Sequence, residues 1–229
     1  MFIGHYAPAL IAAAYQQAPR LGVLFVAAQL VDLAFFGFVL LDIEHLRAVP
    51  GTTVMNAMDL YDMPYTHSLL GSIAFAAAWA FVARVTRHGW PAAAIGAGVV
   101  LSHWFLDLLV HAPDLTLAGD GERYGLGLWN HPVIEMPLET AITAGAFAYY
   151  LTRTSSRTMA GRVSPLTLAL ALAAVQAINW LEPQPATTVD PVPMSQPLTA
   201  LTAYVVLALL ATWVARTRTP RVGPRVRTL

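Results

Sequence analysis

Three ionisable residues, His103, Asp107 and His111, are spaced by four within the apolar stretch 96–114. Residues four apart lie on one face of an α-helix, so these side chains would form a stripe about 12 Å long. Ionisable groups at membrane depth are costly and usually line a functional site. Imidazole and carboxylate together are ligands for zinc, iron or manganese. The stripe therefore predicts a metal site within a membrane-spanning helix.

The composition indicates an integral membrane protein. Of the 229 residues, 57% are hydrophobic and 11% are charged, and the mean hydropathy is +0.57. A soluble globular domain has roughly 25% charged residues, so this chain falls outside that class. Cysteine is absent, which excludes disulfides and thiolate metal sites.

Apolar segments of near-spanning length predict the fold. About 20 apolar residues are needed to cross a bilayer as a helix. Six segments approach this length: Leu21–Leu41, Thr66–Val85, Pro91–His111, Val133–Leu151, Pro165–Leu181 and Pro197–Ala215. A seventh, Gly4–Ala18, is shorter, and we expect it to span because Pro19-Arg20 leaves room only for a tight turn. We predict an all-α, polytopic membrane bundle of six to seven transmembrane helices over residues 1–215, followed by an Arg-rich tail, 216–229.

The charges predict the orientation of this bundle. All thirteen basic residues are arginine, and eleven of them fall on one side if the segments alternate; only Arg47 and Arg123 fall on the other. All thirteen acidic residues lie on that second side or inside the helices. Because basic loops stay in the cytoplasm, we expect a cytoplasmic C-terminus in the inner membrane. The metal site then lies in the outer half, facing the periplasm or outside.

Other segments bring further imidazoles and carboxylates to the same depth. One His–Glu pair at the start of the segment Val133–Leu151 repeats the spacing of four, and such pairs on facing helices build metal sites in bundles. The predicted ligands, enough for two or three ions, are His5, Asp32, His67, His103, Asp107, His111, His131 and Glu135. Glu139 is expected to support these ligands rather than bind an ion.

Several of these residues also have purely structural interpretations. A single histidine in a membrane helix often makes an interhelical hydrogen bond, and Asp32 with Gln29 would form a polar clamp between helices. Glu44 and His45 are expected to be ordinary loop residues. The whole set is harder to explain structurally, since it gathers groups of opposite charge character on separate helices.

Three sequence motifs resemble a known family. GHYAPAL, YTHSLLGS and SHWFLDLLVHAPD resemble the bacterial membrane-bound metal-dependent hydrolases, a family described in part as LexA-binding inner-membrane hydrolases. That family is similar to the zinc-dependent phospholipase C and P1 nuclease superfamily. The ligands of this superfamily occur in the order His, Asp, His, His-x-x-x-Asp, His, His-x-x-x-Glu. The eight predicted ligands follow the same order over about residues 1–140.

The resemblance implies phosphoester hydrolysis, whereas the residues alone imply only metal-assisted chemistry. Two or three zinc ions would bind the phosphate oxygens and lower the pKa of a bridging water toward ~7. The implied catalytic carboxylates are Asp32, Asp107 and Glu135, with Asp107 bridging two ions and Asp32 binding an ion or orienting the attacking water. A site open to the outer leaflet suggests a lipid phosphate or a phospholipid head group as substrate. Arg123 would either hold that phosphate or be a solvated charge of its loop.

The implied division of ligands completes this hypothesis. His67 and His103 would serve one ion, His111, His131 and Glu135 a second, and His5 a third.

Other functions use similar residues. A membrane di-iron oxidase or hydroxylase also binds metal through histidine and carboxylate, although the chain lacks adjacent-histidine boxes. A haem or quinone protein would use paired histidines alone. An ion-coupled transporter would use these groups as a cation relay without hydrolysis. No nucleic-acid partner is expected, because the arginine-rich tail lacks interleaved aromatic residues and is better suited to anionic lipid.

Overall fold

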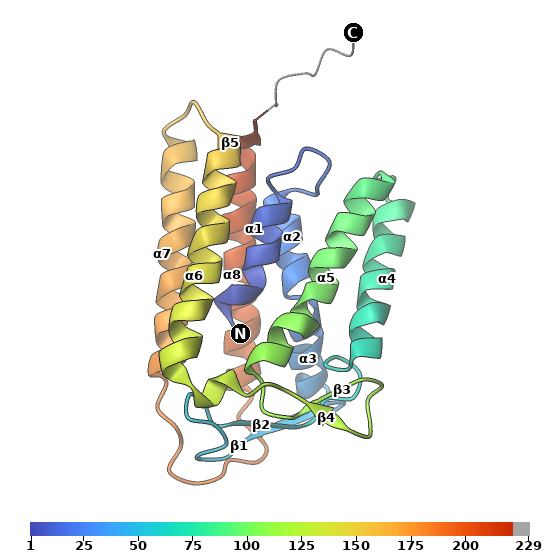
Figure 1. The fold of residues 1–229 in the computed structure, drawn as a ribbon, viewed down its shortest axis with the longest axis vertical. Coiled ribbons are helices and arrows are strands. Elements are labelled where there is room, and N and C mark those ends of the chain that lie inside the picture. Colours follow the sequence, from blue (N-terminus) through green and yellow to red (C-terminus); the bar gives the residue numbers. More distant parts are fainter. Residues whose placement is uncertain (222–229) are drawn as a thin grey trace.

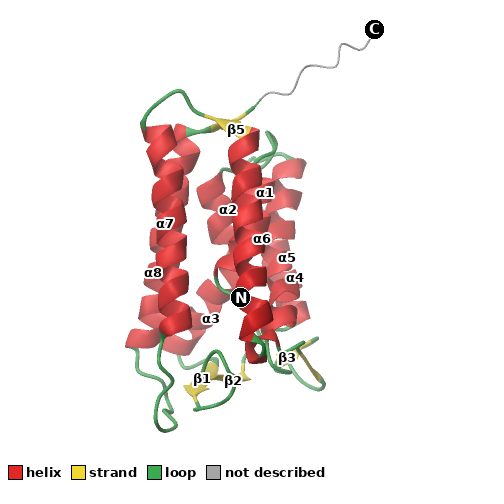
Figure 2. Cartoon of the chain, turned by 60° about the vertical axis from the view of Figure 1, so that its left-hand side comes forward, coloured by secondary structure: helices red, strands yellow, loops and turns green. Residues whose placement is uncertain are grey.

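The computed structural model describes residues 1–221, which form a bundle of helices running side by side with short hairpins at its ends (Figures 1 and 2). The α-helices within this range are α1 (Tyr6–Ala12), α2 (Leu21–Ala28), α3 (Leu30–Leu40), α4 (Leu69–Val85), α5 (Trp90–Val110), α6 (Pro132–Arg153), α7 (Ala160–Leu181) and α8 (Ser195–Thr217). Two short 3-10 helices, η1 (Ile3–His5) and η2 (Leu128–Asn130), precede α1 and α6. The predicted helical fold is therefore confirmed in its class.

Three helices, α5, α7 and α8, are long and apolar enough to cross a membrane. The pair α2 and α3 would provide a fourth span if the two are counted together, and the chain bends by 53° between them. The apolar helix α4 is shorter, with 17 residues, and α6 carries Glu135 and Glu139 on its buried face. By length and composition residues 1–221 thus contain three to four candidate spans, fewer than the six to seven predicted.

The first segment does not cross the bundle as expected. Its helical part ends at Ala12, and ten residues from Ile3 would cover about 15 Å, half of a hydrocarbon core. Tyr6 and Leu10 are fully buried, and the N-terminus lies inside the bundle (Figure 1). Polar Gln16 and Gln17 with Pro19 follow the helix, so α1 is a buried half-helix rather than a span.

Close packing between neighbouring helices depends on small residues. A Cβ atom on Gly22 of α2 would lie 2.0 Å from Thr212 Oγ1 on α8, and one on Gly96 of α5 would lie 2.0 Å from Trp79 Nε1 on α4. A side chain at either position would force these helices apart. The chain between α2 and α3 is held by Gln29, whose Nε2 donates to the carbonyl oxygen of Phe2 at 3.3 Å.

The connections fall into two groups, one at each end of the bundle (Figure 1). One end carries two antiparallel hairpins, β1 (His45–Ala48) with β2 (Met58–Asp62) and β3 (Leu115–Thr116) with β4 (Arg123–Tyr124), and the segment 182–194. The opposite end carries the connections 13–20, 86–89 and 156–159, and the strand pair β5 (Thr154–Ser155) with β6 (Thr219–Pro220). Most arginines belong to this second end, as the alternating segments predict.

The start of the predicted tail is part of the bundle. The Arg218 guanidinium donates to the carbonyl oxygens of Gly161 at 2.9 Å and Thr154 at 3.0 Å, and the Arg221 amide donates to that of Arg153 at 2.8 Å. The bonds to Thr154 and Arg153 cap the C-terminal end of α6, and the bond to Gly161 joins the same segment to α7. The packed part of the chain therefore extends beyond 215. The remainder of the predicted tail, 222–229, lies outside the described residues.

Candidate metal site

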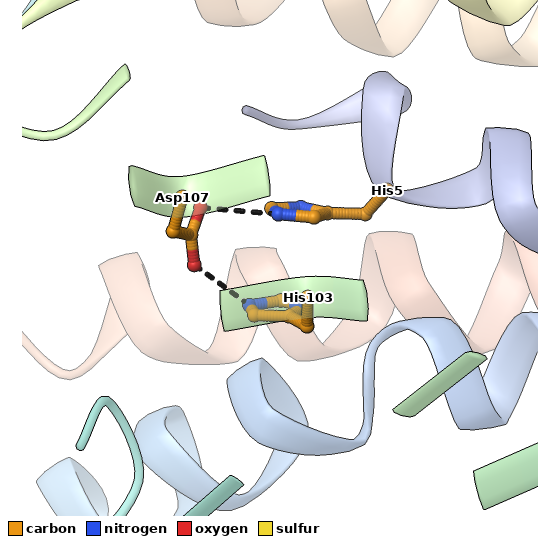
Figure 3. A group of neighbouring side chains, drawn as sticks. All are labelled: His5, His103 and Asp107. Atoms are coloured by element: carbon orange, nitrogen blue, oxygen red, sulfur yellow. Dashed lines mark ion pairs between the residues drawn. The ribbon is translucent and has the colours of Figure 1, made fainter. Parts of the chain in front are cut away.

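Asp107 is the centre of the buried cluster. Its Oδ1 lies 3.0 Å from Nε2 of His5 and 3.4 Å from Nε2 of His111. Its Oδ2 lies 3.0 Å from Nε2 of His103 and 3.8 Å from Nε2 of His67. Figure 3 shows the two shortest of these approaches, with His5 and His103 on opposite oxygens of the carboxylate. One carboxylate therefore faces four imidazoles from different parts of the chain.

Asp32 adds a second carboxylate to the same cluster. Its Oδ1 lies 3.4 Å from Nε2 of both His67 and His103. Two sets have potential ligand atoms that all lie within 4.8 Å of one another, one made of His5, His103 and Asp107 and the other of Asp32, His67 and His103. The structure thus brings together six of the eight predicted ligands. These include the four that stand outside the two His-x-x-x-acid pairs of the motif: His5, Asp32, His67 and His111.

Local structure explains how each residue reaches the cluster. His103 and Asp107 are one turn apart on α5, and His111 is the residue that ends this helix. Asp32 lies in the first turn of α3, directly after the 53° bend at Gln29. His67 precedes Ser68, the N-cap of α4, whose hydroxyl accepts from the Gly71 amide at 3.0 Å. Helix ends and a helix break, rather than helix interiors, therefore position most of the ligands.

Hydrogen bonds on the far side of three rings fix which nitrogen faces the carboxylates. His103 Nδ1 donates to the carbonyl oxygen of Ala28 at 2.8 Å, and His111 Nδ1 donates to Asp114 Oδ1 at 2.8 Å. His67 Nδ1 lies 2.9 Å from the Thr66 hydroxyl. Because a carbonyl or carboxylate only accepts, the Nδ1 atoms of His103 and His111 carry hydrogen. In the neutral ring this leaves the Nε2 lone pair directed at the acids, which is the arrangement found in histidine metal ligands.

Several of these close approaches are not hydrogen bonds. His103 Nε2 and Asp107 Oδ2 are 3.0 Å apart and buried, yet neither has a hydrogen-bond partner. His5 Nε2 is likewise buried without one. Two facing lone pairs repel each other unless a cation lies between them, and buried polar atoms are rarely left unpaired. The donor set and its geometry therefore fit metal ions of the kind that imidazole and carboxylate bind.

The two remaining predicted ligands, Glu135 and His131, differ from each other. Glu135 is 1% exposed, both of its carboxylate oxygens lack a hydrogen-bond partner, and it lines a cavity of about 400 Å³ together with Asp107 and His111. His131 is exposed and belongs neither to this cavity nor to the two ligand groups found in residues 1–221. The expected i, i+4 pairing requires a helix from 131 onward, whereas α6 begins at Pro132 and His131 has φ −129° and ψ 66°. The structure therefore does not bring His131 to the cluster.

Glu139 anchors the N-terminal segment beside the cluster. Its Oε1 accepts from the amides of Phe2 at 2.6 Å and Gly4 at 2.9 Å, and its Oε2 accepts from Gln176 Nε2 at 2.6 Å. The Met1 amino group donates to Asp107 Oδ1 at 3.2 Å. The rings of His5 and His103 stack with centroids 3.9 Å apart. Glu139 thus supports the cluster from outside, and its hydrogen bonds hold the segment before α1 inside the bundle.

Sequence reasoning missed Glu44, and of the two interpretations of Arg123 the position favours the solvated loop charge. Glu44 is completely buried beside His67, although its position in a connection gave no signal that separates it from a solvated loop acid. Arg123 is exposed on β4 and donates to the carbonyl oxygen of Tyr61 at 3.1 Å. Because it does not line the cavity, its expected role in holding a substrate phosphate has no support from its position.

A separate histidine, His45, lies in the hairpin region outside the helices. Its Nδ1 is 2.6 Å from Asp62 Oδ2, and its Nε2 is 3.1 Å from Asp42 Oδ1. The hydrogen bond with Asp62, and the weaker one with Asp42, raise the pKa of His45 above its ordinary value. His45 therefore links β1 to β2 and to the end of α3.

Comparisons with protein-family models, curated proteins and solved structures gave no match for this chain. Its function is therefore inferred from the chemistry of the cluster and the cavity.

Proposed function

We propose that this protein is a membrane-embedded metal-dependent hydrolase that cleaves a phosphoester of a lipid or lipid-like substrate at a site of two or three zinc ions. One observation carries the proposal: buried imidazole Nε2 atoms face the Asp107 carboxylate at 3.0 Å without forming hydrogen bonds. Buried nitrogen and oxygen atoms that lie this close without a hydrogen bond are suited to holding cations rather than to structural hydrogen bonding.

The two oxygens of Asp107 suggest how the ligands divide between ions. Oδ1 faces His5 and His111, whereas Oδ2 faces His103 and His67. One imidazole Nε2 has a single lone pair and serves one ion. His5 and His111 would therefore hold one ion together with Asp107, and His67, His103 and Asp32 would hold another together with the same carboxylate. Glu135 would hold a third ion or complete the first set.

When bound, the ions would supply Lewis-acid activation of the phosphate and a bound water with a pKa near ~7. The role of Asp32 follows from its own contacts. Its Oδ2 accepts from the Tyr204 hydroxyl of α8 at 2.9 Å, which holds Oδ1 toward His67 and His103. Its side chain is 14% exposed, against 3% for Asp107, and it lines the cavity. Asp32 is therefore placed to bind an ion or to orient the attacking water.

The cavity supports an amphiphilic substrate. Its volume of about 400 Å³ lies within the range of small-molecule sites. Besides the acids and histidines, its lining includes apolar residues of α7 and α8: Val175, Ile178, Ala200 and Ala203. A phosphate would bind at the acids and histidines through the ions, while an acyl or prenyl chain would contact the apolar residues.

We further propose six membrane crossings. These are α2 with α3, α4, α5, α6, α7 and α8, because α4 and α6 run alongside the longer apolar helices (Figure 2). The arginine-rich end would be cytoplasmic by the positive-inside rule. The cluster then lies toward the hairpin end, near the outer surface of the inner membrane.

Metal analysis with a lipid phosphatase assay tests the proposed activity. Purified protein should hold two or three zinc ions per chain and should release phosphate from phosphatidic acid, or a phosphorylated head group from phosphatidylcholine. Chelation should abolish this activity and zinc should restore it. Asp107→Asn should lose both metal and activity, whereas Asp120→Asn, a matched change at an exposed loop position, should retain both.

Other outcomes would assign a different function. Bound iron with oxygen consumption would support the di-iron oxidase, and ion flux without hydrolysis would support the transporter. Hydrolysis that survives complete metal removal would overturn the proposal.

A further inference from the structure

Glu44 is a buried carboxylate whose three hydrogen bonds all come from the two residues before His67. It is 0% exposed. Oε1 accepts from the amides of Tyr65 at 2.8 Å and Thr66 at 2.9 Å, and Oε2 accepts from the Thr66 hydroxyl at 2.6 Å. A buried charge is costly unless hydrogen bonds satisfy it. All three hydrogen bonds to the Glu44 carboxylate come from the segment that leads directly into His67.

The Thr66 hydroxyl connects this carboxylate to the imidazole. It has one hydrogen to donate, and it lies 2.6 Å from Glu44 Oε2 and 2.9 Å from His67 Nδ1. Because the carboxylate can only accept, the hydroxyl hydrogen points to Glu44, and the hydroxyl oxygen accepts Nδ1–H of His67. In the neutral ring His67 Nε2 is then unprotonated, and it is this atom that lies 3.4 Å from Asp32 Oδ1.

His67 differs in this respect from the two other oriented histidines. His103 Nδ1 binds a backbone carbonyl and His111 Nδ1 binds a carboxylate, and these acceptors cannot reverse their role. A hydroxyl can. If nothing accepted the Thr66 hydrogen, the hydroxyl could rotate and donate to Nδ1, which would move the ring hydrogen to Nε2 and prevent metal binding.

We propose that Glu44 is a positioning residue that, through the Thr66 hydroxyl, holds His67 in the tautomer and orientation that bind metal. The inference rests on the proposed metal site and extends it to a residue of the connection between α3 and β1. Glu44 does not touch the ions or the substrate; it sets the direction of one hydrogen bond.

Glu44→Gln is the most direct test because it keeps the shape of the side chain and reverses the direction of its hydrogen bond with the Thr66 hydroxyl. With its oxygen kept for the Tyr65 and Thr66 amides, its amide nitrogen would donate to the Thr66 hydroxyl and turn the hydroxyl hydrogen toward His67. We expect a loss of zinc affinity of about 10–100-fold at one ion, the typical effect of a partner outside the ligand set. The remaining ion or ions should keep their affinity in a competition titration against a chromophoric chelator.

Variants at Thr66 and a spectroscopic measurement separate positioning from folding. Thr66→Val should reproduce the loss of zinc affinity. Thr66→Ser should keep the wild-type affinity, since serine retains the hydroxyl. Cobalt substitution should show an altered visible absorption band in Glu44→Gln and Thr66→Val only. Glu122→Gln, at an exposed position, is the matched control.

The outcomes distinguish this inference from the proposed function. A wild-type protein that binds no metal would remove the proposed function itself. Wild-type stoichiometry with unchanged affinity and cobalt spectrum in Glu44→Gln would overturn the positioning role alone. If Glu44→Gln does not fold, the Thr66→Val and Thr66→Ser pair decides the question, and equal affinity in those two variants would overturn it.

Discussion

The molecule contains two cores of different character. One is largely aliphatic: it includes Leu24, Leu168, Leu172 and Leu207 and packs α1, α2, α7 and α8 together. The other is rich in aromatic residues, among them Phe35, Phe36, Trp104, Trp129 and Tyr204. The second core surrounds the acids and histidines: Trp129 packs on His111 with ring centroids 4.4 Å apart, and Phe35 meets His67 edge-on at 5.0 Å.

This difference shows how the bundle accommodates buried charge. The aliphatic core stabilises the fold by apolar packing alone. The aromatic core holds groups whose burial is unfavourable without a cation, and it fixes them with rings of defined shape. Under the proposed function, stability and chemistry would be separated along the bundle, and a substitution should affect mainly one of them.

The largest effect on the site is expected from His103→Ala. His103 belongs to both potential ligand groups, so its loss should lower metal affinity by more than the about 100-fold typical of residues outside the ligand set, and hydrolysis should disappear with the ion. Metal content and phosphate release measure this. His88→Ala, at an exposed histidine of the arginine-rich end, is the control, and equal metal content in both variants would contradict the separation of the two regions.

Leu207→Ala tests the aliphatic core. Leu207 is 0% exposed, and removing such a side chain typically costs about 2–5 kcal/mol of the free energy of unfolding. Denaturation in detergent should detect this loss, while the metal content of the folded fraction stays unchanged. Leu209→Ala, at a position 64% exposed, should change little. Metal loss from folded Leu207→Ala protein would show that the two cores are coupled.

Glu139→Gln examines the boundary between the cores. An amide nitrogen would face Gln176 Nε2, which now donates to Glu139 Oε2 at 2.6 Å, and two donors cannot pair. A lost hydrogen bond to a charged group contributes about 1.5–3 kcal/mol. The uncharged amide oxygen left facing Phe2 and Gly4 also accepts more weakly than a carboxylate, so faster hydrogen exchange at these two amides should follow. Unchanged protection of these amides would show that packing of α1, not Glu139, holds the N-terminal segment.

The smallest effect is expected at the hairpin, from pH. Because Asp62 and Asp42 raise the pKa of His45, protonated His45 stabilises the β1–β2 hairpin. This contribution is fully present below the unfolded pKa of about 6.5 and is lost as pH rises through the higher folded value. Hydrogen exchange of hairpin amides, corrected for its intrinsic pH dependence, should show protection that declines upward from that pH. His45→Gln should remove the dependence, and a flat wild-type profile would contradict it.

Composition and spacing alone predict the membrane character, the helical class and the stripe on α5. The 3.6-residue period places His103 and Asp107 on one face whatever surrounds the helix, and segment alternation groups the arginines at one end. These features depend on composition and on spacing within one element, so local physics is enough to predict them.

Which separate elements meet depends on the packing of the whole bundle. His5 reaches Asp107 because α1 is a buried half-helix whose preceding segment is held by Glu139. Glu44 reaches Thr66, the residue before His67, because the connection after α3 packs against the segment that leads into α4. His131 stays outside although its spacing from Glu135 fits, since α6 begins one residue too late. Such outcomes depend on packing between residues distant in sequence and on where each helix starts and bends, and spacing within one segment does not specify either.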